Sequence, residues 1–492
     1  MMASGKKVPA ITMNGLASHR FNPMRPTIQL AGVLFTFASQ AAALPLCAEE
    51  APRARPLFRI EIVEKNTGWP VPLVELRTTH NVRFITDNAG VIAFDLPELM
   101  GRGTWFDVAG HGYEVPKDGF GYRGVRLTPE PGRTLKVEVN RTIIAKRLGR
   151  ITGAGLFGES QQLGSELNWT ESGVLGCDST QTAVHRGKLF WLWGDTTLAR
   201  YPLGVFDCSS GTSAIQPLEK FEPPVRLKFD LFRDNEGLPR GVGHMAGDGP
   251  TWITAYTSLS DKTGTPRLVA SYAKIKPPLE AYEWGLCVWN EATSNFDKLR
   301  VVWSKSKSTS KRPPMPDGHP MFWKDDAGKE WVLFGNPLPT LRCPATFEAW
   351  QDASTWEELK PQRSVVSATD GKRVKLHSGS LAWNPWRKRW VTVFMEDFGK
   401  PSAFGEVWYA EAKTPTAHCG KAVKILSHDN YTFYNPRIHP EFTATDSPIL
   451  IFEGTYTQTF SDRPFPTPRY EYNQMLYRLD LDDPALKPAQ SE

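Results

Sequence analysis

The chain has 492 residues, of which 40% are hydrophobic and 23% charged, and its formal net charge is +5. This length predicts two domains, and the apolar share is ample for packed cores. So small a charge on so long a chain argues against the domain-wide basic surface of a nucleic-acid-binding protein. Long stretches rich in Ala, Glu, Lys and Leu are absent, which argues against a helical fold.

The first 48 residues are typical of a signal peptide that is removed on export. Two arginines precede an apolar run over 28–43, and Ala48 offers a small residue for cleavage. Met24 is a candidate for the true start of translation. The alternative, a membrane anchor, is disfavoured because the run is short and interrupted by polar residues. We expect a secreted or periplasmic protein without membrane contact after cleavage.

Five cysteines follow the predicted signal peptide, and none has the CxxC spacing of a zinc site. An odd number leaves at least one thiol free. Two outcomes are open for the others. Cys177 and Cys208, the pair closest in sequence, form a disulfide in an oxidising compartment, or all five are buried free thiols.

Residues 56–145 are expected to form a small unit of their own. Short strands such as 57–63 alternate between apolar and polar residues, and turn signals separate them. This spacing predicts a small β-sandwich. The run 84–94, with Gly110-His111-Gly112-Tyr113 after it, resembles the carboxypeptidase regulatory-like module. The resemblance implies a spacer or docking piece without chemistry of its own.

A weak internal repeat covers residues 150–482. Five times, a short polar motif precedes a turn and a strongly apolar strand that ends in a polar or acidic residue. The apolar strands cover 188–195, 252–256, 330–336, 389–396 and 449–453. A single sheet of this kind cannot bury both of its faces, so successive sheets stack around an axis. We predict an all-β fold with a five-bladed β-propeller; the alternative is a two-sheet β-sandwich lectin.

The polar motifs supply the strongest functional signal, because they place different residue types at equivalent points of five blades. These residues are Asp178, Asp248, His319, His377 and Asn435. Cleavage of a glycosidic bond usually needs one ionised and one protonated acidic group. A third carboxylate nearby raises the pKa of the acid. A funnel that collects side chains from separate blades can hold such groups at the required separation.

Five blades with an acidic funnel, the first with an aspartate just before its strand, resemble the five-bladed propeller glycosidases. These include arabinanases, β-xylosidases and neoagarooligosaccharide hydrolases. The resemblance implies that Asp178 is the base or nucleophile and that Asp248 tunes the pKa of the acid. The acid position holds His319 instead of the glutamate of arabinanases. A histidine at this position is similar to the neoagarooligosaccharide hydrolases. The segment 192–196 also resembles the Gly-Asp-Thr strand end of endo-D-arabinanases, which implies a role for Asp195.

Several other residues are candidates for the same funnel. Glu396, Glu453 and Glu406 are alternative acids, because a charge at or beside an apolar strand needs a partner or water. Arg437 is suited to orient a carboxylate or to bind an acidic sugar. The predicted catalytic set is Asp178, Asp248, His319, Asp195 and Glu396. The predicted substrate contacts are His377, Asn435, Arg437, Glu453, Trp252 and Tyr456.

We therefore expect an exported, monomeric glycoside hydrolase that acts on a polysaccharide or oligosaccharide. Two alternatives are open. A non-catalytic carbohydrate-binding propeller would keep the aromatic residues without paired carboxylates, and a protein-interaction propeller would have an exposed apolar face. We expect no nucleic-acid partner and no cofactor, with a structural cation on the propeller axis, held by a histidine through water, as an option.

Overall fold

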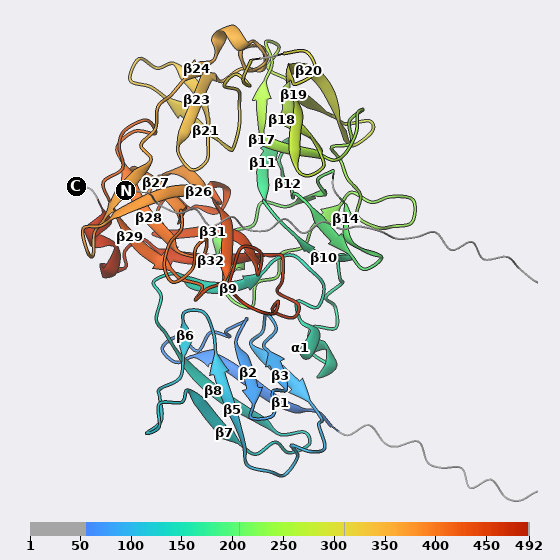
Figure 1. Cartoon of the computed structure of the whole chain (residues 1–492), viewed down its shortest axis with the longest axis vertical. Helices are drawn as coiled ribbons and strands as arrows, with labels where there is room; N and C mark the ends of the chain where they lie inside the picture. The colour runs from blue at the N-terminus through green and yellow to red at the C-terminus, as the bar shows by residue number, and fades with distance from the viewer. Residues whose placement is uncertain (1–55, 206, 309, 491–492) are drawn as a thin grey trace, which may run out of the picture. The chain divides into compact units, whose positions relative to one another are not determined.

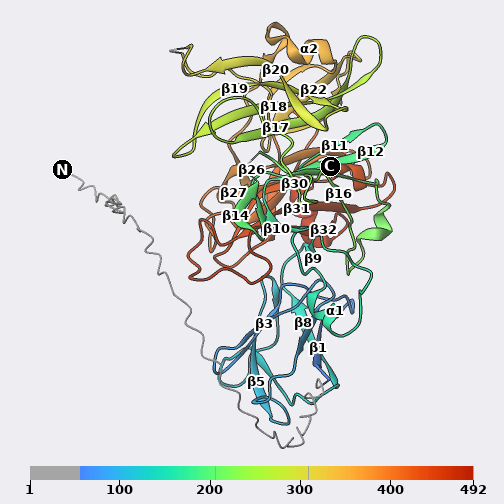
Figure 2. The same cartoon turned by 90° about the vertical axis from the view of Figure 1, so that its right-hand side faces the viewer.

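The structure is a computed structural model that describes residues 56–205, 207–308 and 310–490. Its regular structure is almost entirely β-strand, so the all-β fold expected from the sequence is confirmed (Figures 1 and 2). The predicted signal peptide lies outside the described residues. Within the described ranges, no helix has the length and apolar character needed to cross a membrane.

Two four-stranded sheets make up the N-terminal part of the described chain. The first has the order β4 (Val91–Phe94), β1 (Phe58–Glu64), β8 (Thr134–Arg141) and β6 (Tyr113–Glu114). The second has the order β3 (Arg83–Ile85), β2 (Glu75–Thr78), β5 (Thr104–Ala109) and β7 (Gly124–Leu127). Buried residues alternate along β1, as the period of a half-buried strand requires. They share one apolar core with residues of the second sheet, which is the packing of a β-sandwich.

Five further sheets follow, each with its strands arranged mainly in antiparallel order. The first two contain β11 (Gln181–His185), β12 (Lys188–Leu192), β15 (Ser210–Ser213) and β16 (Asp230–Leu231), and then β17 (Thr251–Ser260), β18 (Pro266–Lys276), β19 (Glu280–Asn290) and β20 (Asn295–Ser304). The third contains β21 (His319–Lys324), β22 (Glu330–Gly335), β23 (Pro339–Pro344) and β24 (Glu357–Glu358). The fourth contains β25 (Ser364–Ser367), β26 (Arg373–Asn384), β27 (Arg389–Glu396), β28 (Val407–Ala412) and β29 (Lys421–Leu426). The fifth contains β30 (Thr432–Ile438), β31 (Ile449–Thr457), β32 (Asn473–Asp480) and β9 (Lys146–Arg150).

Smaller elements connect these sheets. A three-stranded sheet of β10 (Val174–Cys177), β13 (Thr196–Leu198) and β14 (Tyr201–Val205) accompanies the first sheet. The α-helices of the described residues are the short segments α1 (Gly158–Gln162) and α2 (Phe347–Gln351). The cysteines of the described residues, at positions 177, 208, 287, 343 and 419, are all free and buried. The disulfide considered for Cys177 and Cys208 is therefore not formed.

Inner strands of the five sheets contact one another in turn, which is the arrangement of a propeller. Hydrogen bonds join β11 to β17, β17 to the start of β21, the end of β22 to β26, and β26 to β30. The circuit closes where Arg437 of β30 donates to the carbonyl oxygen of Thr182 of β11, at 3.2 Å. Residues far apart in the sequence therefore meet along these inner strands.

The fifth sheet joins the two ends of the ring. Its outer strand β9 precedes the first sheet in the chain, and it pairs antiparallel with β32 near the C-terminus. Pairing of this kind covers the edge that β32 would otherwise expose. β9 lies at the limit between the predicted units 56–145 and 150–482, and those limits stay a prediction, as does the resemblance to the carboxypeptidase regulatory-like module.

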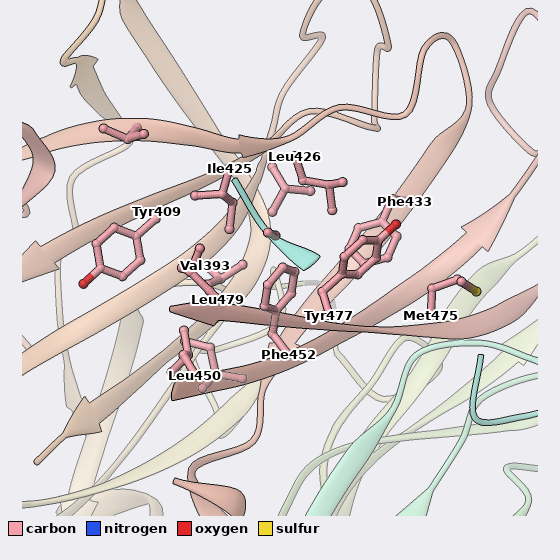
Figure 3. Packing of buried hydrophobic residues seen from close by; sticks show 14 of the residues in the cluster. Val393, Tyr409, Ile425, Leu426, Phe433, Leu450, Phe452, Met475, Tyr477 and Leu479 are labelled. Carbon is pink, nitrogen blue, oxygen red and sulfur yellow. The ribbon is translucent and has the colours of Figure 1, made fainter. Parts of the chain in front are cut away.

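Apolar side chains fill the space between neighbouring sheets. Figure 3 shows one such cluster, in which Val393 and Tyr409 of the fourth sheet accompany Phe452 and Tyr477 of the fifth. Almost every residue of β31 is buried, because neighbouring parts of the chain cover both faces of the strand. This packing holds the inner strands in place, and it is these strands that position the candidate site.

Candidate active site

Asp178 and Asp195 lie side by side at one end of the first sheet. The Asp178 amide donates to the carbonyl oxygen of Asp195 at 3.2 Å, and the Gly194 amide donates to the carbonyl oxygen of Asp178 at 2.8 Å. A β-carbon at position 194 would overlap the Asp178 carboxylate. The glycine of the Gly-Asp-Thr segment thus makes room for the first aspartate while its neighbour supplies the second.

The carboxylate of Asp178 is held by side chains from the fifth sheet. The Tyr434 hydroxyl donates to Asp178 Oδ2 at 2.6 Å, and the Tyr472 hydroxyl also hydrogen-bonds this carboxylate. Burial raises the pKa of Asp178, and the two tyrosines oppose that effect because they favour the ionised form. Burial and the charge of Asp178 raise the pKa of Tyr434 far above its usual value, so its phenol keeps the proton that it donates.

Backbone strain gathers around Asp178. Ser179, Asn435 and Tyr472 have φ angles of 49°, 51° and 58°, in the left-handed region that serine and tyrosine seldom adopt. Asn435 Nδ2 donates to Ser179 Oγ at 2.7 Å, which links the two strained segments across the first and fifth sheets. Such conformations persist where the surrounding structure imposes them, and they are concentrated at functional sites.

Asp195 is a carboxyl group suited to hold a proton. Burial, and after it the charge of Asp178, raises the pKa of Asp195 to about 7, although a hydrogen bond from Trp252 partly offsets this rise. Asp195 Oδ1 is buried without a hydrogen-bond partner among the described residues. The group is therefore about half protonated at neutral pH.

A third carboxylate, Asp207, was not predicted from the sequence. Its charge adds to the rise in the pKa of Asp195. Asp207 Oδ1 accepts a hydrogen bond from the Thr251 amide at 2.8 Å, and Oδ2 lies 2.9 Å from Nδ1 of the exposed His244. Asp207 lies two residues after β14, in a connecting segment, and belongs to none of the five repeat motifs, so the repeat does not point to it.

Asp248 lies apart from this group. It is exposed in the loop before β17, and its backbone carbonyl accepts a hydrogen bond from the Tyr282 hydroxyl at 2.8 Å. The carboxylates that raise the pKa of Asp195 are Asp178 and Asp207. Asp207, and not the predicted Asp248, is therefore the third carboxylate that raises the pKa of a neighbouring acid.

His319 and Arg437 lie in a buried network on the inner strands. Arg437 Nη1 donates to His319 Nδ1 at 3.1 Å. Burial, and then the charge of Arg437, lowers the pKa of His319 well below its usual value, so the ring is neutral at physiological pH. This environment disfavours the predicted acid role of His319. Because the Arg437 guanidinium faces Nδ1 of His319, this nitrogen does not fit the structural cation considered from the sequence.

The same network contains Glu453, which the sequence placed at a strand end. His439 Nε2 lies 2.8 Å from Glu453 Oε1, and His439 Nδ1 lies 2.9 Å from Glu441 Oε1. Burial alone would lower the pKa of His439, but the two carboxylates outweigh burial and raise it. Burial likewise opposes ionisation of Glu441, yet His439 lowers the pKa of Glu441 to about 2. Glu453 and Arg437 are thus buried and partnered inside this network, which disfavours the substrate contacts predicted for them.

Two other predicted residues also lie elsewhere. Glu396 ends β27, where its Oε2 accepts a hydrogen bond from Trp408 Nε1 at 2.9 Å within the fourth sheet. Tyr456 is 1% exposed, and its hydroxyl lies 2.9 Å from Nε2 of His111 of the sandwich. It borders a cleft of about 560 Å³ whose lining includes sandwich residues and none of the aspartates above. Burial leaves Tyr456 no exposed ring face for the sugar stacking predicted for it.

The structure thus brings together four of the predicted residues: Asp178, Asp195, Trp252 and Asn435. His377 is exposed near them on β26, next to Ser378, whose Oγ accepts a hydrogen bond from the Asn435 amide at 3.2 Å. In the described part of the chain, no group of three or more His, Cys, Asp or Glu side chains is arranged to hold a metal ion. What the site offers chemically is a pair of coupled carboxyl groups beside tyrosine hydroxyls and an indole.

No protein-family model matches the chain, and no curated protein matches it. Solved structures do match. An exo-1,5-α-L-arabinanase from a bovine ruminal metagenomic library is 10% identical over 63% of this chain and 94% of its own, with a TM-score of 0.37. An α-L-arabinanase variant of Cellvibrio cellulosa is 11% identical over 65% of this chain and 99% of its own, with a TM-score of 0.37. A putative exo-β-1,3-galactanase of Bifidobacterium bifidum is 10% identical over 61% of this chain and 85% of its own, with a TM-score of 0.34.

Proposed function

We propose that the chain is a glycoside hydrolase whose acid–base chemistry is carried by Asp178 and Asp195. The observation that carries the proposal is the pairing of two neighbouring carboxyl groups in different surroundings. Burial raises the pKa of both groups, but the tyrosine hydroxyls favour the ionised form of Asp178, whereas the neighbouring charges favour the protonated form of Asp195. Two interacting carboxyl groups in different surroundings are the usual basis for assigning an acid and a base.

In the proposed reaction, Asp195 gives its proton to the leaving glycosidic oxygen as the bond from that oxygen to the anomeric carbon breaks. Asp178 accepts a proton from the water that attacks the same carbon, or it attacks the carbon itself and is later released by water. The two routes give sugars of opposite anomeric configuration, which NMR of the first product distinguishes. In both routes Asp207 keeps the proton affinity of Asp195 high.

Trp252 and Asn435 fit the part of substrate contacts. Trp252 is 36% exposed beside Asp195, so part of its ring is open to a sugar face. Asn435 lies on β30 and donates a hydrogen bond to Ser179, next to Asp178. The proposed substrate is therefore a polysaccharide or oligosaccharide that binds between the fifth and second sheets.

Single variants test the proposal on a panel of arabinan, galactan, xylan and agarose. Asp178→Asn and Asp195→Asn should each slow release of sugar by roughly 10²–10⁴-fold, the usual contribution of a positioned acid or base. Asp248→Asn is the matched control, since it removes an exposed carboxylate away from the pair and should leave the rate unchanged. Equal rates for wild type and Asp178→Asn would refute the assignment. Binding of a polysaccharide without any product would instead favour a non-catalytic binding propeller.

The proposed enzyme is exported and monomeric. The charge and apolar pattern of residues 1–48 support a signal peptide, and the sandwich of residues 56–145 would act as a spacer before the propeller of residues 150–482. N-terminal sequencing of protein recovered from the medium or the periplasm tests export. A mature chain that begins before residue 40 would contradict the cleavage site.

A further inference from the structure

Four aromatic side chains gather beside the candidate site, three on connecting segments and one on β26. We call Phe398, Phe404, Phe460 and His377 the rim aromatic cluster. The ring centroid of Phe404 lies 5.1 Å from that of Phe398, 6.1 Å from that of Phe460 and 5.2 Å from that of His377. Phe398 and Phe460 are 71% and 70% exposed. Each thus presents most of an apolar ring to solvent instead of to a core.

The backbone at both exposed phenylalanines is strained. Phe398 has a φ of 53° and Phe460 a φ of 64°, in the left-handed region where glycine and asparagine are favoured and bulky residues are rare. Neither ring gains burial in return. Phe398 and Phe460 are thus unfavourable in both backbone conformation and exposure, and both contact Phe404. This combination points to a functional demand for aromatic rings at the two positions.

The cluster adjoins the proposed catalytic pair through the inner strands of the fourth and fifth sheets. The amide of Phe433 donates to the carbonyl oxygen of Phe404 at 2.8 Å, and the next residue, Tyr434, donates to Asp178. His377 precedes Ser378, which accepts a hydrogen bond from Asn435. Phe404, in the turn between β27 and β28, is thus hydrogen-bonded to the residue next to Tyr434. Trp252 lies beside Asp195 on the side of the second sheet.

We propose that Phe398 and Phe460 form a stacking platform for a sugar ring beyond the cleaved bond, so that the substrate is a saccharide chain of several units. Flat apolar rings suit the apolar face of a sugar, and these two rings lie on either side of Phe404. This inference rests on the proposed hydrolase function and specifies its substrate class.

The test exchanges each phenylalanine for the residue that the backbone prefers. Phe398→Asn and Phe460→Asn remove the ring and relieve the left-handed strain, so resistance to urea should stay equal or rise. Affinity for the polysaccharide that the wild type degrades should fall about 3–10-fold for each, when binding is measured in the Asp195→Asn background. KM for that polysaccharide should rise with kcat little changed. Hydrolysis of a 4-nitrophenyl glycoside of the same sugar should be unaffected, because this small substrate does not reach the platform.

Controls separate this inference from the proposed function. Phe120→Asn removes a ring that is 91% exposed on the sandwich and should change neither binding nor rate. Phe460→Tyr should restore most of the affinity lost in Phe460→Asn. If wild type cleaves the polysaccharide while both asparagine variants bind it as tightly, the platform is refuted and the hydrolase stands. If wild type neither binds nor cleaves any polysaccharide of the panel, both fall. Loss of self-association in the variants with unchanged saccharide affinity would assign the cluster to a protein interface and overturn the inference.

Discussion

Replacing Asp195 with asparagine should stabilise the protein at neutral pH, although it removes the proposed catalytic acid. The pKa of Asp195 is raised from 3.8 to about 7 in the folded chain. Between these values the folded state binds more protons than the unfolded state, so the native aspartate costs stability as pH rises from about 4 to about 7. This rise in the pKa corresponds to roughly 4 kcal/mol, which partial solvent contact reduces to about 2–3 kcal/mol.

Urea unfolding at pH 4, 5.5, 7 and 8, followed by tryptophan fluorescence, measures this effect. The difference in unfolding free energy between Asp195→Asn and wild type should be near zero at pH 4 and should grow in favour of the variant up to about pH 7. Above that pH it should level off. A difference that stays flat across the pH range would refute the reasoning that Asp195 is held protonated by its surroundings.

Three further variants probe the electrostatics and the space at the pair. The activity of the proposed enzyme should decline above about pH 7 as Asp195 loses its proton. Trp252→Phe removes a hydrogen bond that favours ionised Asp195, so the decline should move to higher pH. Asp207→Asn removes a negative charge that favours protonated Asp195, so the decline should move to lower pH. Shifts in the same direction, read from pH–rate profiles, would contradict these roles. Gly194→Ala should lower kcat/KM at least about 100-fold, because a 1 Å misplacement of a catalytic group costs that much and the new methyl overlaps the Asp178 carboxylate. Full activity of a folded Gly194→Ala protein would show that the carboxylate position is unimportant.

The sequence was sufficient to predict the strands and the class of fold, because alternating and continuous apolar runs directly report which faces are buried. It also predicted Asp178, Asp195, Trp252 and Asn435 as site residues. What the repeat could not reveal was how deeply each residue is buried. Asp178 precedes β11 and is half-buried, whereas His319 is already the first residue of β21 and is buried.

Strand length explains other errors. Glu453 was taken for a strand end, but β31 continues to Thr457, so the carboxylate lies in the middle of the strand and needs the buried partner His439. Tyr456 is buried for the same reason. Asp207 and Tyr472 come from connecting segments, where no periodic pattern constrains position. Such residues are found only once the ring has brought the connections together.

The pairing of β9 with β32 also sets an order on the assembly of the molecule. β9 is synthesised long before β32, so its edge lacks its native partner until the ribosome has made nearly the whole chain. A truncated protein that begins at residue 151 would lose this strand and leave the last sheet with an open edge. Any recombinant version of the propeller without the sandwich must therefore start ahead of Lys146 to remain a closed circle.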